Sequence, residues 1–267
     1  MVLFIQRDPW LSHGILERED KTMTKHLVLC AGVVAACASV ALATPINYGN
    51  RAGATVDFLN VTEDSSTDPT PLFGSPSAVV DSLVFNPVSF ASFSANGAFD
   101  LTDGTLTTMV DARPGNNIPV VTINESGDYT LAGTGSPSTW CSASLSVFVT
   151  VYEVNDVAVN AFTQSFTGSF SPNGGFFSLP ANAANAALWT GSGSLNVDAM
   201  VAAAGYVGQH ATKLQITLDN SLLTFSEPGT IAHIKKKQTG GVIINVPTPG
   251  ALALVGLGGL VAGRRRR

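Results

Sequence analysis

The chain has 267 residues, of which 45% are hydrophobic and only 12% are charged. This composition excludes a largely disordered chain and provides enough apolar residues for one large domain or two small ones to bury a core. Residues 44–246 carry fifteen acidic side chains and six basic ones. An acidic body argues against nucleic acid as a partner, because phosphate binding needs clustered cations.

The first 43 residues are not expected to be part of the mature folded protein. Residues 23–43 have a short basic lead, an apolar run and the small-residue site Ala41-Leu42-Ala43 before Thr44. Those are the three parts of a secretory signal helix, so we expect signal peptidase to cleave after Ala43. Residues 1–22 carry four acids, which is unusual ahead of an export signal. We therefore expect them to be a non-native or disordered extension, and the true start codon stays open.

Two alternatives to this cleavage remain. Val34-Ala35-Ala36-Cys37 resembles a bacterial lipobox, in which the Cys37 thiol would be lipidated. The apolar run could instead be a buried helix of a cytosolic domain. If the signal is removed, Cys141 is the one cysteine left, so the exported chain could form no internal disulfide.

From residue 55 onward the sequence alternates apolar and polar residues, which indicates strands with one buried face. Turn residues separate these segments, for example Asp103-Gly104 and residues 126–128. Short strands without long amphipathic helices between them predict an all-β fold, an antiparallel β-sandwich of jelly-roll-like or Ig-like type, over residues 44–237. The expected strands are 55–61, 79–85, 105–112, 120–125, 144–154, 159–168 and 213–219, with a last one at 230–234.

Four segments depart from this pattern. Residues 181–189 and 196–208 are rich in alanine, so we expect at most a turn or two of helix there. Lys235, Lys236 and Lys237 would protect the exposed end of a final edge strand, or alternatively contact acidic polysaccharide or lipid. Residues 238–246 are expected to be a linker.

The C-terminal residues 246–267 combine a turn, an apolar stretch and a cation cluster. Val246-Pro247-Thr248-Pro249 precedes fourteen small and apolar residues, and Arg264, Arg265, Arg266 and Arg267 follow. Fourteen helical residues reach only about 21 Å, whereas a bilayer core is about 30 Å thick. We expect a short hydrophobic helix that holds the chain in the inner membrane transiently, with the arginines on the cytoplasmic side. A plain tail anchor is the alternative.

This three-part order resembles the PEP-CTERM sorting signal of exported bacterial proteins. In that family the motif is usually Val-Pro-Glu-Pro, and Thr248 stands where the acid would be. The resemblance covers residues 246–267 and implies processing by an exosortase-type membrane protease close to the motif. It implies nothing about the function of the exported body.

The sequence holds few candidates for catalysis. Beyond the signal, His210 and His233 are the only histidines, and no metalloprotease, nucleophile-elbow, phosphate-loop or CxxC motif occurs. We expect His210 on the surface, His233 on a strand and Cys141 buried. A hydrolase built from a serine, His210 and Asp219 is the alternative, but serine is too common in this chain for that combination to indicate a site, so the chain is predicted not to be an enzyme.

The sequence offers residues for two kinds of binding site. Asp64 and Asp68, and Asp100 and Asp103, supply carboxylates within loop-sized spans that would suit calcium, although polar loops are the simpler interpretation. Trp140, Trp189, Tyr152, Phe176 and Phe177 could form an aromatic platform for a carbohydrate. No cofactor is predicted. The sequence favours an exported cell-envelope or extracellular-matrix protein with a structural or adhesive role; the alternative is a carbohydrate-binding module, with or without calcium, whose partner is extracellular polysaccharide.

Overall fold

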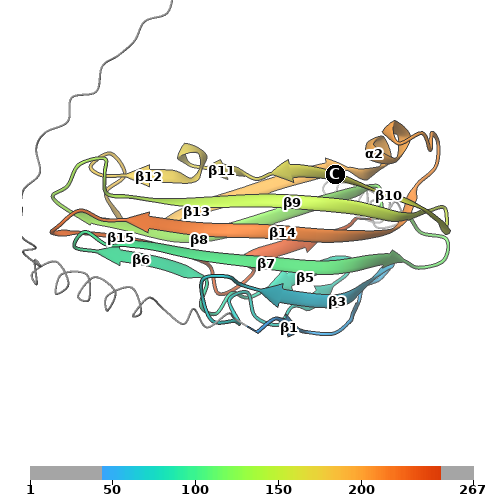
Figure 1. Cartoon of the computed structure of the whole chain (residues 1–267), viewed down its shortest axis with the longest axis horizontal. Coiled ribbons are helices and arrows are strands. Elements are labelled where there is room, and N and C mark those ends of the chain that lie inside the picture. The colour runs from blue at the N-terminus through green and yellow to red at the C-terminus, as the bar shows by residue number, and fades with distance from the viewer. Residues whose placement is uncertain (1–43, 248–267) are drawn as a thin grey trace, which may run out of the picture. The chain divides into compact units, whose positions relative to one another are not determined.

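The computed structural model describes residues 44–247, which form two antiparallel sheets packed as a sandwich (Figure 1). The prediction of an antiparallel β-sandwich is confirmed. Sheet A contains β1 (Ile46–Asn47), β2 (Arg51–Ala52), β3 (Val56–Asp64), β7 (Phe99–Ala112), β9 (Trp140–Val154), β10 (Val157–Thr167), β12 (Phe176–Ser178) and β14 (Ala211–Phe225). Sheet B contains β4 (Ser77–Val79), β5 (Ser82–Phe85), β6 (Ala91–Ala95), β8 (Val120–Gly133), β11 (Ser169–Ser171), β13 (Ala184–Asn196), β15 (Thr230–Lys236) and β16 (Val242–Asn245).

Three long strands form the centre of sheet A. β14 pairs with β7 on one side and with β9 on the other, and Figure 1 shows the three running side by side along the sandwich. Buried and half-exposed residues alternate along β14 from Thr212 onward, as a strand with one face in the core requires. Leu214, Ile216 and Leu218 are fully buried and face the apolar inner side of sheet B. The period-two pattern of the sequence therefore marks the core face correctly.

Two predicted turns are wrong, because glycine serves another purpose at both. Gly104 lies inside β7, and Gly127 lies inside β8. A Cβ atom on Gly104 would lie 2.7 Å from the Phe90 ring, and one on Gly127 would overlap the Trp189 ring and the Lys235 carbonyl. Both glycines thus provide room for aromatic rings rather than a change of chain direction.

The predicted linker at 238–246 is also wrong in part. Val242–Asn245 form β16, which lies between β8 and β5 in sheet B. Val246 is buried, and its amide donates to the carbonyl of Asp81 at 2.9 Å. The sandwich therefore extends past residue 237 and includes the first residue of the predicted sorting motif.

The lysines at 235–237 do not protect an edge strand. β15 has a partner on each side, β6 and β8, so it lies inside sheet B. Lys235 is exposed, whereas Lys236 is fully buried within the sandwich. The edge interpretation is therefore wrong, and the buried lysine needs a separate explanation.

Helix is scarce within residues 44–247. α2 (Val197–Ala203) forms in the alanine-rich segment 196–208, and the Asn196 side chain caps it by accepting from the Ala199 amide at 2.8 Å. The other such segment, 181–189, enters β13 at Ala184 instead. A single 3-10 turn, η1 (Asn173–Gly175), precedes β12. In this part of the chain, no helix is long and apolar enough to span a membrane.

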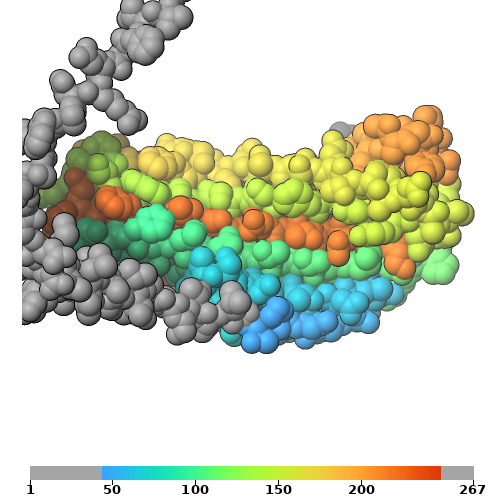
Figure 2. All heavy atoms as spheres, viewed as in Figure 1, coloured from blue at the N-terminus to red at the C-terminus, as the bar shows by residue number. Residues whose placement is uncertain are grey.

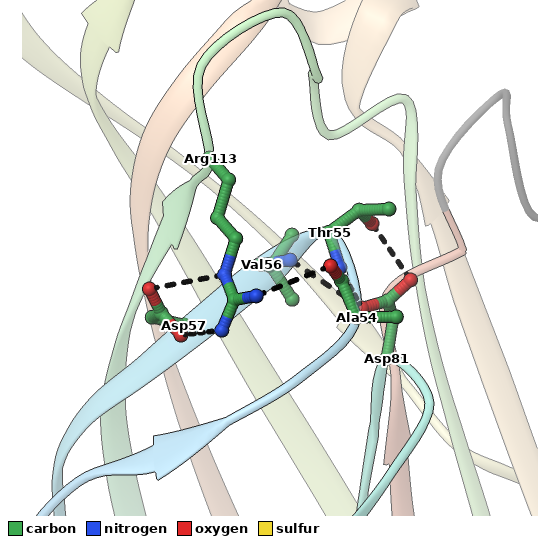
Figure 3. Close-up of polar contacts among 6 residues, drawn as sticks. All are labelled: Ala54, Thr55, Val56, Asp57, Asp81 and Arg113. Atoms are coloured by element: carbon green, nitrogen blue, oxygen red, sulfur yellow. Dashed lines mark hydrogen bonds and ion pairs between the residues drawn. The ribbon is translucent and has the colours of Figure 1, made fainter.

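One buried carboxylate joins the two sheets near the start of β3 (Figure 3). Asp81, in the turn between β4 and β5, accepts the Thr55 amide at 2.8 Å, the Thr55 hydroxyl at 2.7 Å and the Val56 amide at 3.3 Å. Nearby, Arg113 binds Asp57 through two nitrogens at 2.7 and 3.3 Å, and both side chains are more than a third exposed. Asp81 therefore closes this end of the sandwich from within, whereas the Arg113 pair lies at the surface.

Candidate functional site: an aromatic row on sheet A

Four aromatic side chains gather on the outer face of sheet A, at the end where β9 begins and β14 ends. Phe225 lies directly opposite Phe99 of β7 on one side and Trp140 of β9 on the other. Phe176 of β12 stacks on Trp140, with ring centroids 5.6 Å apart and planes 29° apart. Because neighbouring strands are about 4.8 Å apart, these rings form a continuous row about 15 Å long across four strands.

The row is open to solvent. Phe99 is 56% exposed and Phe176 is 48% exposed, which is unusual for phenylalanine in a protein with a well-filled core. β7, β14 and β9, which carry three of the four rings, form long neighbouring bands in the space-filling view (Figure 2). A shallow hollow of about 540 Å³ lies over the row, lined by Pro137, Ser138, Trp140, Phe176 and Phe225.

A carboxylate fixes the loop that forms the rim of this hollow. Glu227, in the turn after β14, accepts the Ser136 amide at 2.7 Å, the Ser136 hydroxyl at 2.9 Å and the Thr139 hydroxyl at 3.1 Å. The Ser136 amide bond is the main reason that the pKa of Glu227 is lowered. The loop that carries Pro137 and Ser138 is therefore held in place beside the rings.

The aromatic residues suggested by the sequence divide into two groups. Trp140 and Phe176 belong to the row, whereas Trp189 and Phe177 are buried in the core. Tyr152 is half-buried and lies twelve residues along β9 from Trp140, about 40 Å away. A platform made of all five residues is therefore wrong.

Phe99 and Phe225 were missed by the sequence analysis. Each is the outermost residue of a long strand, Phe99 at the start of β7 and Phe225 at the end of β14. The alternation of β14 does place Phe225 on the outer face. Its position beside Trp140 depends on the pairing register, which one sequence does not contain.

The carboxylates considered for calcium do not come together as expected. The Asp103 amide and carbonyl bind hydroxyls of the 65–67 loop, including Ser65 at 2.6 Å, so this loop packs on Asp103. Asp100 instead accepts the Phe93 amide at 2.8 Å from sheet B. The pairing of Asp100 with Asp103 as ligands is therefore wrong. Within residues 44–247, no three acidic, histidine or cysteine side chains converge as metal ligands.

A carboxyl pair missed by the sequence analysis lies on the same face as the aromatic row. Burial, and next the neighbouring Asp103, raise the pKa of Asp219 to about 6. Glycosidases hold their two carboxyl groups about 5 to 9.5 Å apart to leave room for the sugar or a water molecule. A pair in direct hydrogen-bonding contact does not match that arrangement.

The remaining candidates for catalysis lie apart from one another. His210 contacts Asp198 at 2.9 Å, beside α2. Asp219 lies nine residues along β14 from His210, about 30 Å away, so the hypothetical hydrolase of His210 and Asp219 is wrong. His233 is half-buried on β15, and burial lowers its pKa. Cys141 is buried as expected, which raises the pKa of its thiol to about 12.

Most residues of the predicted processing signals lie outside the described residues. This applies to Cys37, Ala41, Ala43, Thr248, Pro249 and Arg264 to Arg267, and to both predicted terminal helices. Thr44 is exposed, and its carbonyl accepts from the Thr70 hydroxyl at 3.0 Å. Val246 is buried and Pro247 is half-exposed.

No family model and no curated protein matches the chain. Among solved structures, it is similar to the enzymatically active domain of bacteriophage CBA120 tailspike protein 4, at 12% identity over 78% of this chain, with a TM-score of 0.21. The chain spans only 20% of that structure. It is also similar to TmCBM61 in complex with β-1,4-galactotriose, at 6% identity over 72% of this chain and 83% of that one, with a TM-score of 0.19.

The family 11 xylanase from Neocallimastix patriciarum is similar at 10% identity, over 77% of this chain and 99% of that one, with a TM-score of 0.19. Scores this low carry no argument about function. The candidate site rests on the residues of this chain alone.

Proposed function

We propose that this protein is an exported, non-enzymatic binding module that attaches to polysaccharide through the aromatic row of Phe99, Phe225, Trp140 and Phe176. The observation that carries the proposal is the row itself, in which four exposed or half-exposed rings adjoin across four strands of a rigid sheet. This combines the adhesive role and the carbohydrate alternative expected from the sequence.

The chemistry of the row suits sugars. The C–H groups on one side of a pyranose ring carry partial positive charge and pack on the electron-rich face of an aromatic ring. A row of such faces binds an extended chain of sugars, and adjacent hydroxyl groups such as that of Ser138 supply hydrogen bonds that fix its orientation. Since Glu227 holds the rim loop in place, little conformational entropy is lost on binding.

Export and sorting are part of the proposal and rest on the sequence. Residues 23–43 would direct export, and residues 246–267 would retain the chain in the inner membrane until an exosortase-type protease acts. Because β16 and Val246 belong to the sandwich, we place cleavage shortly beyond Val246, where it leaves the sheet intact.

Binding to a glycan array and to insoluble polysaccharides tests the proposed function. Trp140→Ala and Phe225→Ala should each weaken binding about tenfold, because each removes a buried contact worth about 1 to 2 kcal/mol in the complex. Phe148→Ala is the matched control. Phe148 is 45% exposed on the same face of β9 but lies about 26 Å from Trp140, so its removal should leave binding unchanged.

Three results would overturn the proposal: no binding to any polysaccharide, equal losses for Phe148→Ala and Trp140→Ala, or cleavage of the bound polymer. The sorting proposal is tested separately by mass spectrometry of the termini of the protein from native cells. We expect Thr44 as the first residue and a last residue shortly after Val246. A first residue at Cys37 carrying lipid would replace signal-peptidase cleavage with lipidation, and intact termini would refute processing.

A further inference from the structure

Three polar side chains meet inside the sandwich, between the two sheets. Lys236 of β15 donates to one carboxylate oxygen of Glu125 at 2.6 Å, and Asn220 of β14 donates its side-chain amide to the other oxygen at 2.6 Å. Lys236, Glu125 and Asn220 are all buried, and the side chains of the ion pair have no exposed surface. A single carboxylate therefore bridges an amine and a carboxamide in a place without access to water.

Aromatic rings enclose this group. The Lys236 ammonium lies 5.1 Å from the Phe90 ring centroid and 5.5 Å from that of Trp189. The side-chain oxygen of Asn220 and the indole nitrogen of Trp189 are buried without a hydrogen-bond partner. Desolvation lowers the pKa of Lys236 despite the opposing effect of Glu125, so the neutral amine becomes more accessible.

A simple ion pair is a poor explanation of this arrangement. Taking two charges out of water costs several kcal/mol per ion, and attraction offsets that cost only when the remaining polar atoms are also satisfied. Here the Asn220 oxygen is not satisfied. A neutral lysine beside a carboxamide and a proton-carrying carboxyl group is, in contrast, a complete set of reactants for amide exchange.

We propose that Lys236 and Asn220 join in an intramolecular isopeptide bond, with Glu125 as the proton carrier. Lys236 first passes one proton to Glu125, which leaves both groups neutral. The Nζ lone pair then attacks Cγ of Asn220. As the Nζ–Cγ bond forms and the Cγ–Nδ2 bond breaks, Glu125 gives its proton to Nδ2 and takes one from Nζ.

The products are a secondary amide between the two side chains and one molecule of ammonia. Glu125 is protonated at the end, as it was when the attack began. The atoms balance without an oxidant, a reductant or a co-reactant. The geometry fits this relay, because the two oxygens of Glu125 already contact the attacking and the departing nitrogen separately.

The bond would connect the sheets covalently. Asn220 lies in sheet A and Lys236 in sheet B, so the amide would be a covalent tie between two sheets that otherwise meet through packing and hydrogen bonds. Cys141 is the one cysteine within residues 44–247, and it is free. The inference is independent of the aromatic row and of the sorting proposal.

Peptide mass mapping of the purified chain tests the bond. In a chymotryptic digest, which cuts after Phe225 between the two residues, we expect the peptides that contain Asn220 and Lys236 to be recovered joined, lighter than their sum by one ammonia, about 17 Da. Lys236→Met and Glu125→Gln should each abolish the joined peptide. Lys235→Met is the matched control, since Lys235 is exposed and pairs with Asp128 at 3.8 Å, and its chymotryptic peptides should still be joined with the same loss of about 17 Da.

Circular dichroism of each variant shows whether it has folded, and the native chain alone decides the question if the variants fail to fold. Recovery of Lys236 and Asn220 in separate peptides of full mass from the folded native chain would overturn the proposal. Loss of water, about 18 Da, in a peptide that joins Lys236 to Glu125 would overturn the assignment of Asn220 as the acceptor.

Discussion

Replacing Asp81 by alanine provides the sharpest test of how the two sheets are held at the end drawn in Figure 3. Asp81 is 2% exposed and accepts three hydrogen bonds from Thr55 and Val56. Its removal leaves the Val56 amide, which is fully buried, without this acceptor. We expect the free energy of unfolding to fall by about 3 to 5 kcal/mol, since hydrogen bonds to a charged group contribute about 1.5 to 3 kcal/mol each and the losses overlap.

Asp57→Ala is the matched control, because it removes a carboxylate with two hydrogen bonds from the same end of the sandwich. The side chains of Asp57 and Arg113 are 37% and 40% exposed, so water replaces the partner and we expect a loss below about 1 kcal/mol. Urea unfolding followed by circular dichroism measures both changes, provided that the slope of the transition stays constant. Equal effects of Asp81→Ala and Asp57→Ala would refute the reasoning from burial.

Three further predictions concern other parts of the fold and use the same urea assay. Gly127→Ala should cost more than about 3 kcal/mol, because the new methyl group overlaps the ring of Trp189, and a near-neutral result would contradict the packing described for β8. Ile244→Ala should cost about 2 to 5 kcal/mol and Ile243→Ala, which is half-exposed, clearly less; equal small losses would mean that β16 is not part of the core. Asp219→Asn should stabilise the protein by about 1 kcal/mol above pH 6, after allowance for solvent screening. The raised pKa, about 6 against 3.8, means that the folded state binds the proton more tightly, so the advantage of the variant should shrink as pH falls from about 6 to 4; an advantage independent of pH would contradict it.

The class of fold could be predicted from the sequence because strand alternation is a local property. Side chains of a strand point to opposite faces in turn, so burial on one face leaves a period of two in the sequence whatever the partner strand is. The position of a turn, in contrast, also depends on residues far away in the sequence. Asp103-Gly104 has the composition of a turn, yet the glycine lies in the middle of β7 because the rings of Phe73 and Phe90 occupy the space of its side chain. That reason lies in distant residues.

The candidate site could be predicted only in part, since the pairing register of the strands determines which aromatic side chains lie next to one another. Trp140 and Phe176 were identified as aromatics that could face solvent, but nothing local separates them from Trp189, which is buried. Phe99 and Phe225 join the row only because β14 pairs with β7 and β9 in one particular alignment. A shift by one residue would turn Phe225 into the core.

The burial of Lys236 depends on residues of the other strands of sheet B. Gly127 lacks a side chain, so the Trp189 ring can lie against β8 at that position. Trp189 in turn covers Lys236, which binds Glu125, two residues before Gly127 on the same strand. A lysine within a run of three cations predicts a solvated strand end, and that prediction fails because β8 supplies both the space for the ring and the carboxylate. Gly127 therefore leaves room for the ring that keeps water from Lys236, as the proposed amide exchange requires. Substitution of Gly127 should affect the cross-link as well as stability.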